Sequence, residues 1–284
     1  MPQDLAGRTM FITGGSRGIG LAIALRAARD GANVALLAKT AEPHPKLPGT
    51  IYTAADEIEA AGGAALPIVG HVRDADSVAG AVEQAAERFG GIDILVNNAS
   101  AISLTPIEQT EPKRFDLMQG INVRGTFLAI RACIPHLKGS ENGHILSLSP
   151  PINLDPAWLG PHGAYTLSKY GMSLITLAAA EELREAGVAA NTLWPRTIIA
   201  TAAVQNLLGG DEAMSRARTP EIYADAAYQV LIQPARESTG QTLIDDEVLA
   251  AAGVTDLEPY RAGPGDGDLI GDLFVDPSPL RSTS

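Results

Sequence analysis

Short apolar runs alternate with longer amphipathic stretches along most of this chain, and this alternation limits the folds open to it. Seven runs have the length and composition of buried strands. They are Thr9–Ile12, Asn33–Ala38, Ala65–Val69, Ile92–Val96, His144–Leu148, Val188–Leu193 and Gln241–Ile244. The intervening stretches carry apolar residues at helical spacing. They lie at about 18–30, 51–61, 75–89, 112–137, 163–186 and 220–232.

Continuous apolar strands that alternate with helices indicate a parallel sheet covered on both faces. We therefore expect an α/β protein with a doubly wound, seven-stranded parallel sheet of the Rossmann type. A ligand of such a fold binds beyond the carboxyl ends of the strands. The length of 284 residues suits one domain, in which 247–284 forms a C-terminal extension packed on the rest.

Charge and composition exclude several classes of partner. The net charge of −12 argues against nucleic acid and anionic membranes, which both require a basic surface. No apolar run approaches the ~18 residues of a membrane span, and no secretory signal is visible at the N-terminus. The only cysteine, Cys133, cannot form an internal disulfide. These features favour a cytoplasmic protein. The histidines form no cluster with ligand spacing, so no metal site is expected.

The first strand leads directly into the sequence Thr13-Gly-Gly-Ser-Arg-Gly-Ile-Gly20, and a helix follows. Glycines let the backbone approach a pyrophosphate, and a helix N-terminus presents free N–H groups to an anion. Glycines alone mark a tight turn, but after the first strand of a doubly wound fold they indicate a dinucleotide site. The predicted contacts within this loop are Gly14, Ser16, Arg17, Gly18, Ile19 and Gly20.

The end of the second strand bears on which dinucleotide is bound. An NAD site usually carries an acidic residue there, which accepts a hydrogen bond from the ribose 2′-hydroxyl. Here the strand ends Leu37-Ala38-Lys39-Thr40 with no acid. Lys39 and Arg17 are either solvated surface cations or partners of a 2′-phosphate. We therefore expect NADP(H) to be preferred over NAD(H).

Tyr165 and Lys169 lie four residues apart in a predicted helix, and so on one face of it. A nearby ammonium lowers the pKa of a phenol toward the range of an acid/base catalyst. Taken alone, the spacing also fits two residues that merely share a helix face.

Together these motifs resemble the short-chain dehydrogenase/reductase family. The resemblance rests on the glycine loop, Asn97-Asn-Ala99, Asn122 and the Tyr165–Lys169 pair, in that order, and covers about residues 5–246. Some members of the family carry a sterol-carrier domain after the reductase part. This chain ends without one, so we expect no lipid transfer.

The resemblance implies roles for individual residues. Tyr165 would exchange a proton with the substrate oxygen, Lys169 would hold the nicotinamide ribose, and Asn122 would anchor a water that serves as a proton relay. Asn122 could equally bind only the local backbone. Further cofactor contacts are implied for His71, Val72, Asn98 and Ile198.

One departure from the family pattern affects the catalytic set. The family usually has two serines after its fifth strand, and the second polarises the substrate carbonyl. Here the run reads Ser147-Leu-Ser149-Pro150, and proline has no donor. Ser149 either substitutes through a shifted backbone or is a buried serine satisfied by the main chain. Arg196, at another departure, would meet an anionic substrate or point to solvent.

Apolar residues fill the two loops that the fold places next to a substrate. They are Ile152, Leu154, Trp158, Leu159, Trp194, Ile198, Ile199, Leu207 and Leu208. They would suit a hydrophobic carbonyl or secondary alcohol, lipid- or steroid-like compounds among them, or they pack into the core or a subunit interface. The face formed by Gly171, Ser173-Leu174, Leu177-Ala178 and Ala180 would allow a homo-oligomer, a dimer or tetramer.

Two functions of different classes follow from these observations. The first is an NADP(H)-dependent oxidoreductase that transfers hydride between nicotinamide and a hydrophobic carbonyl/alcohol pair. The alternative is an NADP(H)-binding regulatory or scaffold protein whose catalysis is impaired, and Pro150 motivates it.

Overall fold

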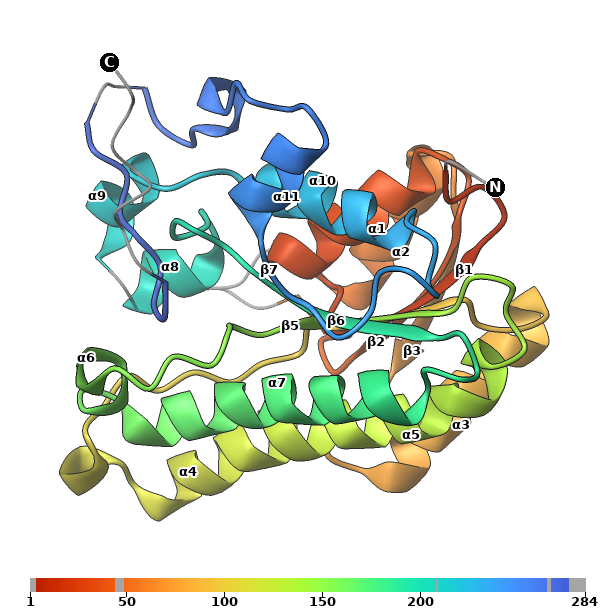
Figure 1. The fold of residues 1–284 in the computed structure, drawn as a ribbon, viewed down its shortest axis with the longest axis horizontal. Coiled ribbons are helices and arrows are strands. Elements are labelled where there is room, and N and C mark those ends of the chain that lie inside the picture. Colours follow the sequence, from red (N-terminus) through yellow and green to blue (C-terminus); the bar gives the residue numbers. More distant parts are fainter. Residues whose placement is uncertain (1–3, 44–48, 208, 265–266, 276–284) are drawn as a thin grey trace.

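The chain folds into a seven-stranded parallel sheet with helices on both faces, seen in a computed structural model (Figure 1). The structure describes residues 4–43, 49–207, 209–264 and 267–275. The strands are β1 (Thr9–Thr13), β2 (Asn33–Ala38), β3 (Ala64–Val69), β4 (Ile94–Asn97), β5 (His144–Leu148), β6 (Ala189–Trp194) and β7 (Thr242–Ile244). Their order is β3-β2-β1-β4-β5-β6-β7, which confirms the predicted fold class.

The strand order reverses between β1 and β4. Thr13, the last residue of β1, pairs with Asn97, the last residue of β4. The chain leaves these two strands in opposite directions, so their carboxyl ends open a crevice where such folds bind ligands.

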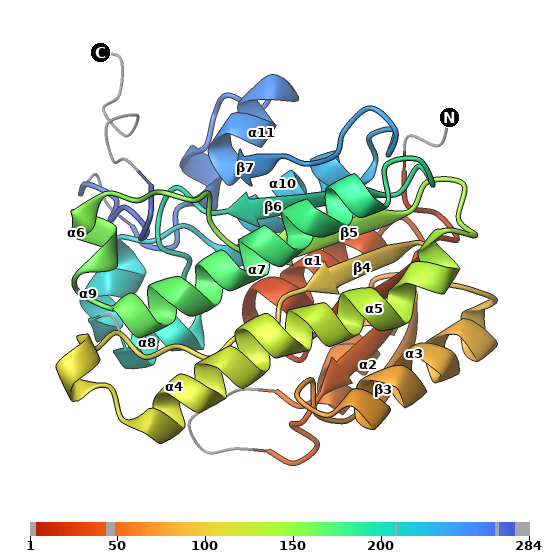
Figure 2. The same ribbon diagram turned by 60° about the horizontal axis from the view of Figure 1, so that its bottom comes forward.

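Two layers of helices cover the sheet (Figures 1 and 2). One layer contains α1 (Gly18–Ala28), α2 (Ile51–Ala60), α10 (Pro220–Leu231) and α11 (Asp245–Ala251). The other contains α3 (Ala75–Phe89), α5 (Gly125–Leu137) and α7 (Gly163–Glu182). Shorter helices are α4 (Pro112–Met118), α6 (Pro156–Leu159), α8 (Ala202–Leu207) and α9 (Gly210–Ser215).

Alternating strand residues supply the two cores. Along β1, Met10 and Ile12 pack with α1 and α10, while Phe11 packs with the opposite layer. Successive side chains of a strand point to opposite faces, so a strand buried on both faces is apolar at every position. This is why the strands appear in the sequence as continuous apolar runs.

The predicted helix 112–137 is interrupted in its middle. Gln119–Arg124 is π-helical and joins α4 to α5 without a break in the chain. A π-turn accommodates an extra residue within a helix and often lies at a functional site. Asn122 lies within it.

Residues after β7 pack back onto the sheet domain. Leu249 of α11 joins the core between the sheet and the layer of α1 and α10, and Tyr260 donates a hydrogen bond to Asp225 of α10 at 2.7 Å. Further along, Phe274 and Val275 join a third apolar cluster with Tyr165 and Trp194. The extension is described to residue 275, and positions 276–284 of the predicted extension lie outside the described residues.

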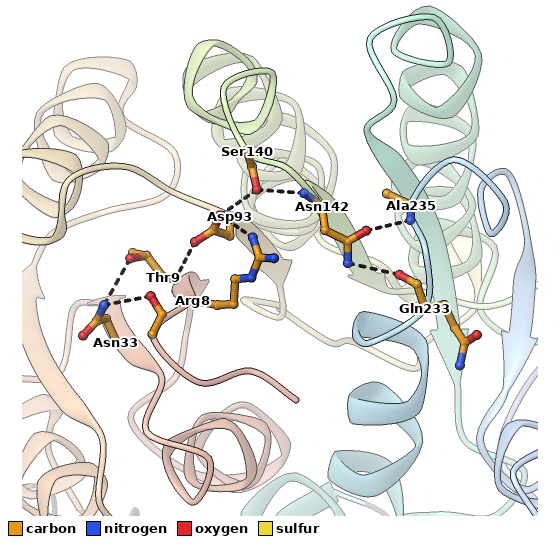
Figure 3. A network of polar contacts seen from close by, with 9 residues as sticks. Arg8, Thr9, Asn33, Asp93, Ser140, Asn142, Gln233 and Ala235 are labelled. Atoms are coloured by element: carbon orange, nitrogen blue, oxygen red, sulfur yellow. Dashed lines mark hydrogen bonds and ion pairs between the residues drawn. The ribbon is translucent and has the colours of Figure 1, made fainter. Parts of the chain in front are cut away.

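A polar network closes the opposite, amino-terminal edge of the sheet (Figure 3). Asp93 accepts from the backbone N–H of Thr9 at 2.8 Å and from Ser140 Oγ at 2.6 Å, and it pairs with Arg8 at 3.3 Å. Asn142 links the same edge to the end of α10 through Gln233 and Ala235. The network ties β1, β4 and the loops around β5 together.

Candidate active site

The glycine loop between β1 and α1 is held against the end of β4. Nδ2 of Asn98 donates to the carbonyls of Thr13 and Gly14 at 2.9 and 2.8 Å. A Cβ at Gly20 would lie 2.5 Å from that nitrogen, and a Cβ at Gly14 would lie 2.9 Å from Cα of Ala99. Gly14 also has a φ of 71°, which favours glycine. The glycines are therefore required by close packing, and the side chain of Asn98 is used to shape the loop.

The first turn of α1 is left available to a ligand. Its N-cap residue, Arg17, makes no side-chain capping bond, and the first turn contains no acidic residue. By contrast, Thr50 caps α2 in a reciprocal capping box and Asp74 caps α3 through the N–H of Ser77. Uncapped N–H groups and the helix dipole together could hold an anion here, beside Ser16, Gly18 and Ile19.

Lys39 and Arg17 lie at one corner of this edge. Lys39 is exposed directly after β2. Arg17 Nη2 donates to the carbonyl of Gly49 at 2.9 Å, and Ile51 N–H, two residues on, donates to the carbonyl of Thr40 at 2.9 Å. The short segment 49–51 therefore links the Arg17 side chain to the backbone directly after Lys39.

His71 and Val72 follow the end of β3. The ring of His71 is exposed, while its backbone N–H donates to Ser77 Oγ at 3.0 Å. Val72 is partly buried, and a Cβ at Gly125 of α5 would lie 3.2 Å from it. Both residues thus lie on the carboxyl edge of the sheet, where a bound adenine would be expected.

Asn122 is fully buried, and its side chain holds the chain after β4 against α7. Its Oδ1 accepts from the N–H of Ala101 at 2.7 Å, and Nδ2 donates to Ala101 O and to Ser168 Oγ, both at 2.9 Å. Both amide N–H donors are used. A relay water can be held by this side chain only through the second lone pair of Oδ1.

Tyr165 and Lys169 lie on the inward face of α7, and each is only 4% exposed. Nζ of Lys169 donates to the carbonyl of Leu148 at 2.8 Å and lies 5.1 Å from the centre of the Trp194 ring. The helix thus delivers a phenol and an ammonium to the carboxyl ends of β5 and β6.

The pKa values of this pair differ from the sequence-based expectation. Burial raises the pKa of Tyr165 above its ordinary value, and the charge of Asp272 raises it further. Burial also lowers the pKa of Lys169 to about 8. Both effects on Tyr165 disfavour the phenolate, so Tyr165 holds its proton at neutral pH. The phenol is accordingly a proton donor in this state.

The serines after β5 have different roles. Ser147 Oγ accepts from Asn97 Nδ2 at 3.2 Å and from Thr176 Oγ1 at 2.7 Å, so it is a structural residue. Ser149 is fully buried, and its Oγ has no hydrogen-bond partner among the described residues. This arrangement differs from the interpretation of Ser149 as a serine satisfied by the main chain. Pro150 offers only its carbonyl, which accepts from Ser173 Oγ at 2.6 Å.

Arg196 fits neither of the two interpretations made from the sequence. The residue is buried, its guanidinium pairs with Asp246 and Glu247, and its backbone N–H donates to Asp245 at 2.8 Å. The ion pairs raise the pKa of Arg196 despite its burial. The side chain therefore secures the loop after β6 to the start of α11.

The apolar residues of the two predicted substrate loops divide into buried and exposed sets. Trp194, Ile198 and Ile199 are buried, whereas Ile152, Leu154 and Leu159 are exposed and Trp158 is intermediate. Leu208 and the side chain of Leu207 lie outside the described residues.

Three residues near Tyr165 have no signal in the local sequence. His162 precedes α7, is buried, and its Nε2 has no partner in the described part of the chain. Phe274 stacks on Tyr165 with ring centres 6.2 Å apart and 30° between the planes. Asp272 is a buried carboxyl whose pKa is raised to about 7 by burial. Only the return of the C-terminal segment reveals the last two.

Comparison with known proteins places the chain in a family. The family model described as "short chain dehydrogenase" matches residues 8–210. The chain belongs to the short-chain dehydrogenase/reductase family. Its members are oxidoreductases that bind a nicotinamide cofactor, and the doubly wound fold and glycine loop described above agree with this membership.

Named relatives extend the similarity over almost the whole chain. "Hydroxysteroid dehydrogenase-like protein 2" from Danio rerio is 58% identical over 97% of this chain, and the match spans 65% of the relative's length. A crystal structure of a short-chain dehydrogenase from Mycobacterium thermoresistibile is 66% identical, with a TM-score of 0.91 over 96% of this chain and 97% of that one.

A more distant relative was solved with a cofactor. It is a metagenomic short-chain oxidoreductase in complex with NADP, 28% identical with a TM-score of 0.69, and the match covers 84% of this chain and 97% of that one. Among the described helices of the present chain, none is both long and apolar enough to cross a membrane.

Proposed function

We propose that this short-chain dehydrogenase/reductase is an NADP(H)-dependent oxidoreductase acting on a hydrophobic carbonyl or secondary alcohol, with Tyr165 as its general acid/base. The observation that carries the proposal is the position of Tyr165 and Lys169 on the inward face of α7, at the carboxyl ends of β5 and β6 and so on the same edge of the sheet as the crevice between β1 and β4. The cofactor and the acid/base group then belong to one site within a single domain, residues 1–284.

The preference for NADP(H) rests on the corner formed by Arg17, Lys39 and residues 49–51. The two residues directly after β2 are Lys39 and Thr40, so no carboxylate at this position accepts from a ribose 2′-hydroxyl or repels a 2′-phosphate. Lys39 is exposed and can reach an anion. Gly14, Ser16, Gly18, Ile19 and Gly20 would hold the pyrophosphate, while His71, Val72 and Asn98 would lie along the adenosine.

When bound, the cofactor supplies or accepts the hydride. In reduction, Tyr165 donates its proton to the substrate oxygen as that oxygen becomes an alcohol. Tyr165 carries this proton at neutral pH, and the ammonium of Lys169 would stabilise the phenolate that remains after its transfer. Lys169 would also hold the nicotinamide ribose, Ile198 would bind the carboxamide through its backbone, and Asn122 would support the water that returns the proton.

Ser149 is the proposed second donor to the carbonyl oxygen. Its hydroxyl is buried without a partner among described residues, so it can donate to a ligand without losing another bond. An unpaired buried hydroxyl costs stability, which makes a ligand a physical reason for its presence.

A turnover screen over aldehydes, ketones and secondary alcohols, run with NADPH and with NADH, tests this proposal. We expect turnover of an apolar substrate and a lower KM for NADPH than for NADH. Equal affinity for the two cofactors would contradict the assignment of Lys39 and Arg17.

A second candidate is an NADP(H)-binding regulatory or scaffold protein with impaired catalysis. Pro150 favours it, because the usual serine donor is missing at that position. The expected result for this candidate is tight NADPH binding with no turnover of any compound in the screen.

A homo-oligomer is proposed from the outer face of α5 and α7. Phe127, Leu167 and Leu174 are each more than half exposed there. Ser173 and Ala180, which the sequence placed on the contact face, are buried within the chain instead. Light scattering after gel filtration of Leu174→Glu should show a smaller species than the wild type.

A further inference from the structure

The segment 270–275 lies over the proposed nicotinamide end of the site, paired with the loop that follows β6. Ile198 N–H donates to Ile270 O, and Asp272 N–H donates to Arg196 O, both at 3.0 Å. Thr197 and Gly271 form an antiparallel bridge between these two bonds. The backbone N–H of Ile198 is therefore already used by the protein's own tail.

Phe274 anchors the segment inside a ring of aromatic side chains. Its own side chain is 1% exposed, and its ring centre lies 5.3 to 6.2 Å from five others. These belong to Trp158, His162, Tyr165, Tyr170 and Trp194. Leu273 O also accepts from Trp194 Nε1 at 2.7 Å. The phenyl ring of Phe274 thus covers the phenol of Tyr165, which a substrate would have to approach.

The seated segment carries two unfavourable features. Phe274 has a φ of 72° and is the one non-glycine residue with a positive φ in the described part of the chain. Asp272 is a fully buried carboxyl, with Lys169 and Asp245 as the charges that act on it. Strain and buried charge of this kind persist where function requires them.

None of the described residues covers the adenosine end of the same site. Lys39 and His71 are exposed, and the first turn of α1 has no side-chain cap. The two ends of the crevice therefore differ, since one is open and the other is filled by residues 270–275.

We propose that residues 270–275 form a displaceable plug, anchored by Phe274, that excludes the nicotinamide ring and the substrate from Tyr165 until the cofactor drives it out. The inference rests on the proposed function, which makes Tyr165 the group that both ligands approach. The adenosine half binds first to the open end, and entry of the nicotinamide half displaces the plug.

A cavity next to Phe274 could receive its side chain when the plug is displaced. Phe274 and Val275 also line a cavity of about 360 Å³ together with Ile152, Leu154 and Ile244. A turn of the Phe274 ring into this cavity would end its stacking on Tyr165. The aromatic side chains left behind then line the vacated space and suit a substrate with an apolar ring or chain next to its carbonyl.

Ligands that fill one half or both halves of the crevice test the plug on the full chain. Calorimetry measures the affinity of NADPH, which needs both halves, and of 2′,5′-ADP, which needs only the open half. For Phe274→Ala we expect NADPH to bind about tenfold tighter, as when the competent form is about 10% populated in the wild type, with 2′,5′-ADP unchanged. Leu249→Ala, a buried tail variant away from the site, should change neither affinity.

Equal or weaker NADPH binding by Phe274→Ala would overturn the proposal and show that residues 270–275 are a fixed part of the site. Running NADH and ADP in parallel covers a site that prefers NAD(H). Absence of binding by all four ligands to the wild type would overturn the proposed function, and the plug with it.

Hydrogen exchange on the wild-type chain provides a test without a substitution. The amides of Ile270 and Asp272 are hydrogen-bonded in the seated plug. We expect their exchange to quicken when NADPH binds and to stay unchanged with 2′,5′-ADP. Slower exchange with NADPH would show that the segment closes on the cofactor, and would overturn the proposal.

Discussion

The two edges of the sheet use polar residues in opposite ways. At the amino-terminal edge, Asp93 and Asn142 bond to backbone and side-chain groups of neighbouring elements (Figure 3). At the carboxyl edge, Ser149 Oγ, His162 Nε2 and Asp245 Oδ2 are buried without a partner among the described residues. Paired groups stabilise a fold, while unpaired buried groups cost stability and remain available to a ligand.

His144 shows that burial alone does not make a site. It lies at the amino-terminal edge, where burial lowers its pKa to about 4 and its Nε2 faces the carbonyl of Gln233 at 3.0 Å. Its Nδ1 is buried without a partner among the described residues, so an unpaired atom alone does not make a site either. A neutral histidine bonded to the backbone is a structural residue. At the carboxyl edge, by contrast, the unpaired His162 lies beside the phenol of Tyr165, with ring centres 6.4 Å apart.

Removal of the phenol should give the largest effect. Tyr165→Phe deletes the proposed proton donor and should lower turnover by about 10²- to 10⁴-fold, while thermal stability stays close to that of the wild type. Steady-state kinetics and a melting curve measure the two quantities. Unchanged turnover in this variant would show that Tyr165, at the carboxyl edge, is not the general acid/base.

The opposite pattern is expected at the amino-terminal edge. Asp93→Ala leaves Thr9 N–H, Ser140 and Arg8 without their shared acceptor and should cost about 3 kcal/mol of unfolding free energy. Urea denaturation measures this, with the exposed Asp56→Ala as the matched control. A large loss of kcat in the folded fraction of Asp93→Ala would break the distinction between the edges.

Stability should fall as pH rises through neutrality because of the acids at the carboxyl edge. Burial raises the folded-state pKa of Asp245 and Asp272 from 3.8 to about 7. Because the folded chain then holds the proton more tightly than the unfolded chain, each group's contribution to stability is complete below about pH 4 and is lost as pH rises through 7. Between pH 5 and 8 the free energy of unfolding should fall by about 2–3 kcal/mol for each of these carboxyl groups, since one pKa unit is worth about 1.4 kcal/mol.

Asp272→Asn should flatten this pH dependence, and denaturation series at pH 5 and pH 8 would show it. The lowered pKa of Lys169, about 8, acts in the opposite direction, because its contribution grows as pH rises from 8 to its ordinary value of 10.5. An unchanged slope in Asp272→Asn would mean that Asp272 is ionised in the folded chain.

Ser147 in β5 and Ser149 directly after it allow a hydrogen-bonded hydroxyl to be compared with an unpaired one. Ser147→Ala removes a bond partner from Asn97 and Thr176 and should cost about 1–2 kcal/mol of stability. Ser149→Ala removes an unpaired hydroxyl, so stability should hold or rise slightly while turnover falls. Activity retained by Ser149→Ala would assign the carbonyl contact to another group or to water.

Much of the fold could be predicted because its determinants are local. Strands buried on both faces are apolar throughout, so all seven were found, with ends within two residues of the observed ones. The short helices α6, α8, α9 and α11 were missed, since four to seven residues give too few turns for a periodic pattern. The π-helical turn at Asn122 was also missed, because an extra residue in a helix leaves no mark on composition.

The site was predicted where its residues sit in motifs and was missed where they meet through tertiary contacts. Tyr165 and Lys169 are one helical turn apart, so their shared face is legible in the sequence. Phe274 and Asp272 reach them only when the extension folds back, and no local pattern reports that. The pKa of Tyr165 was misjudged for a related reason, because burial and the charge of Asp272 depend on the complete fold.

A crystal structure of the full chain with NADPH would show where the cofactor lies relative to Tyr165 and residues 270–275. We expect the pyrophosphate at the first turn of α1, the nicotinamide beside Tyr165 and Lys169, and residues 270–275 displaced from Ile198. A cofactor bound away from the crevice between β1 and β4, with Tyr165 still covered by Phe274, would contradict this expectation.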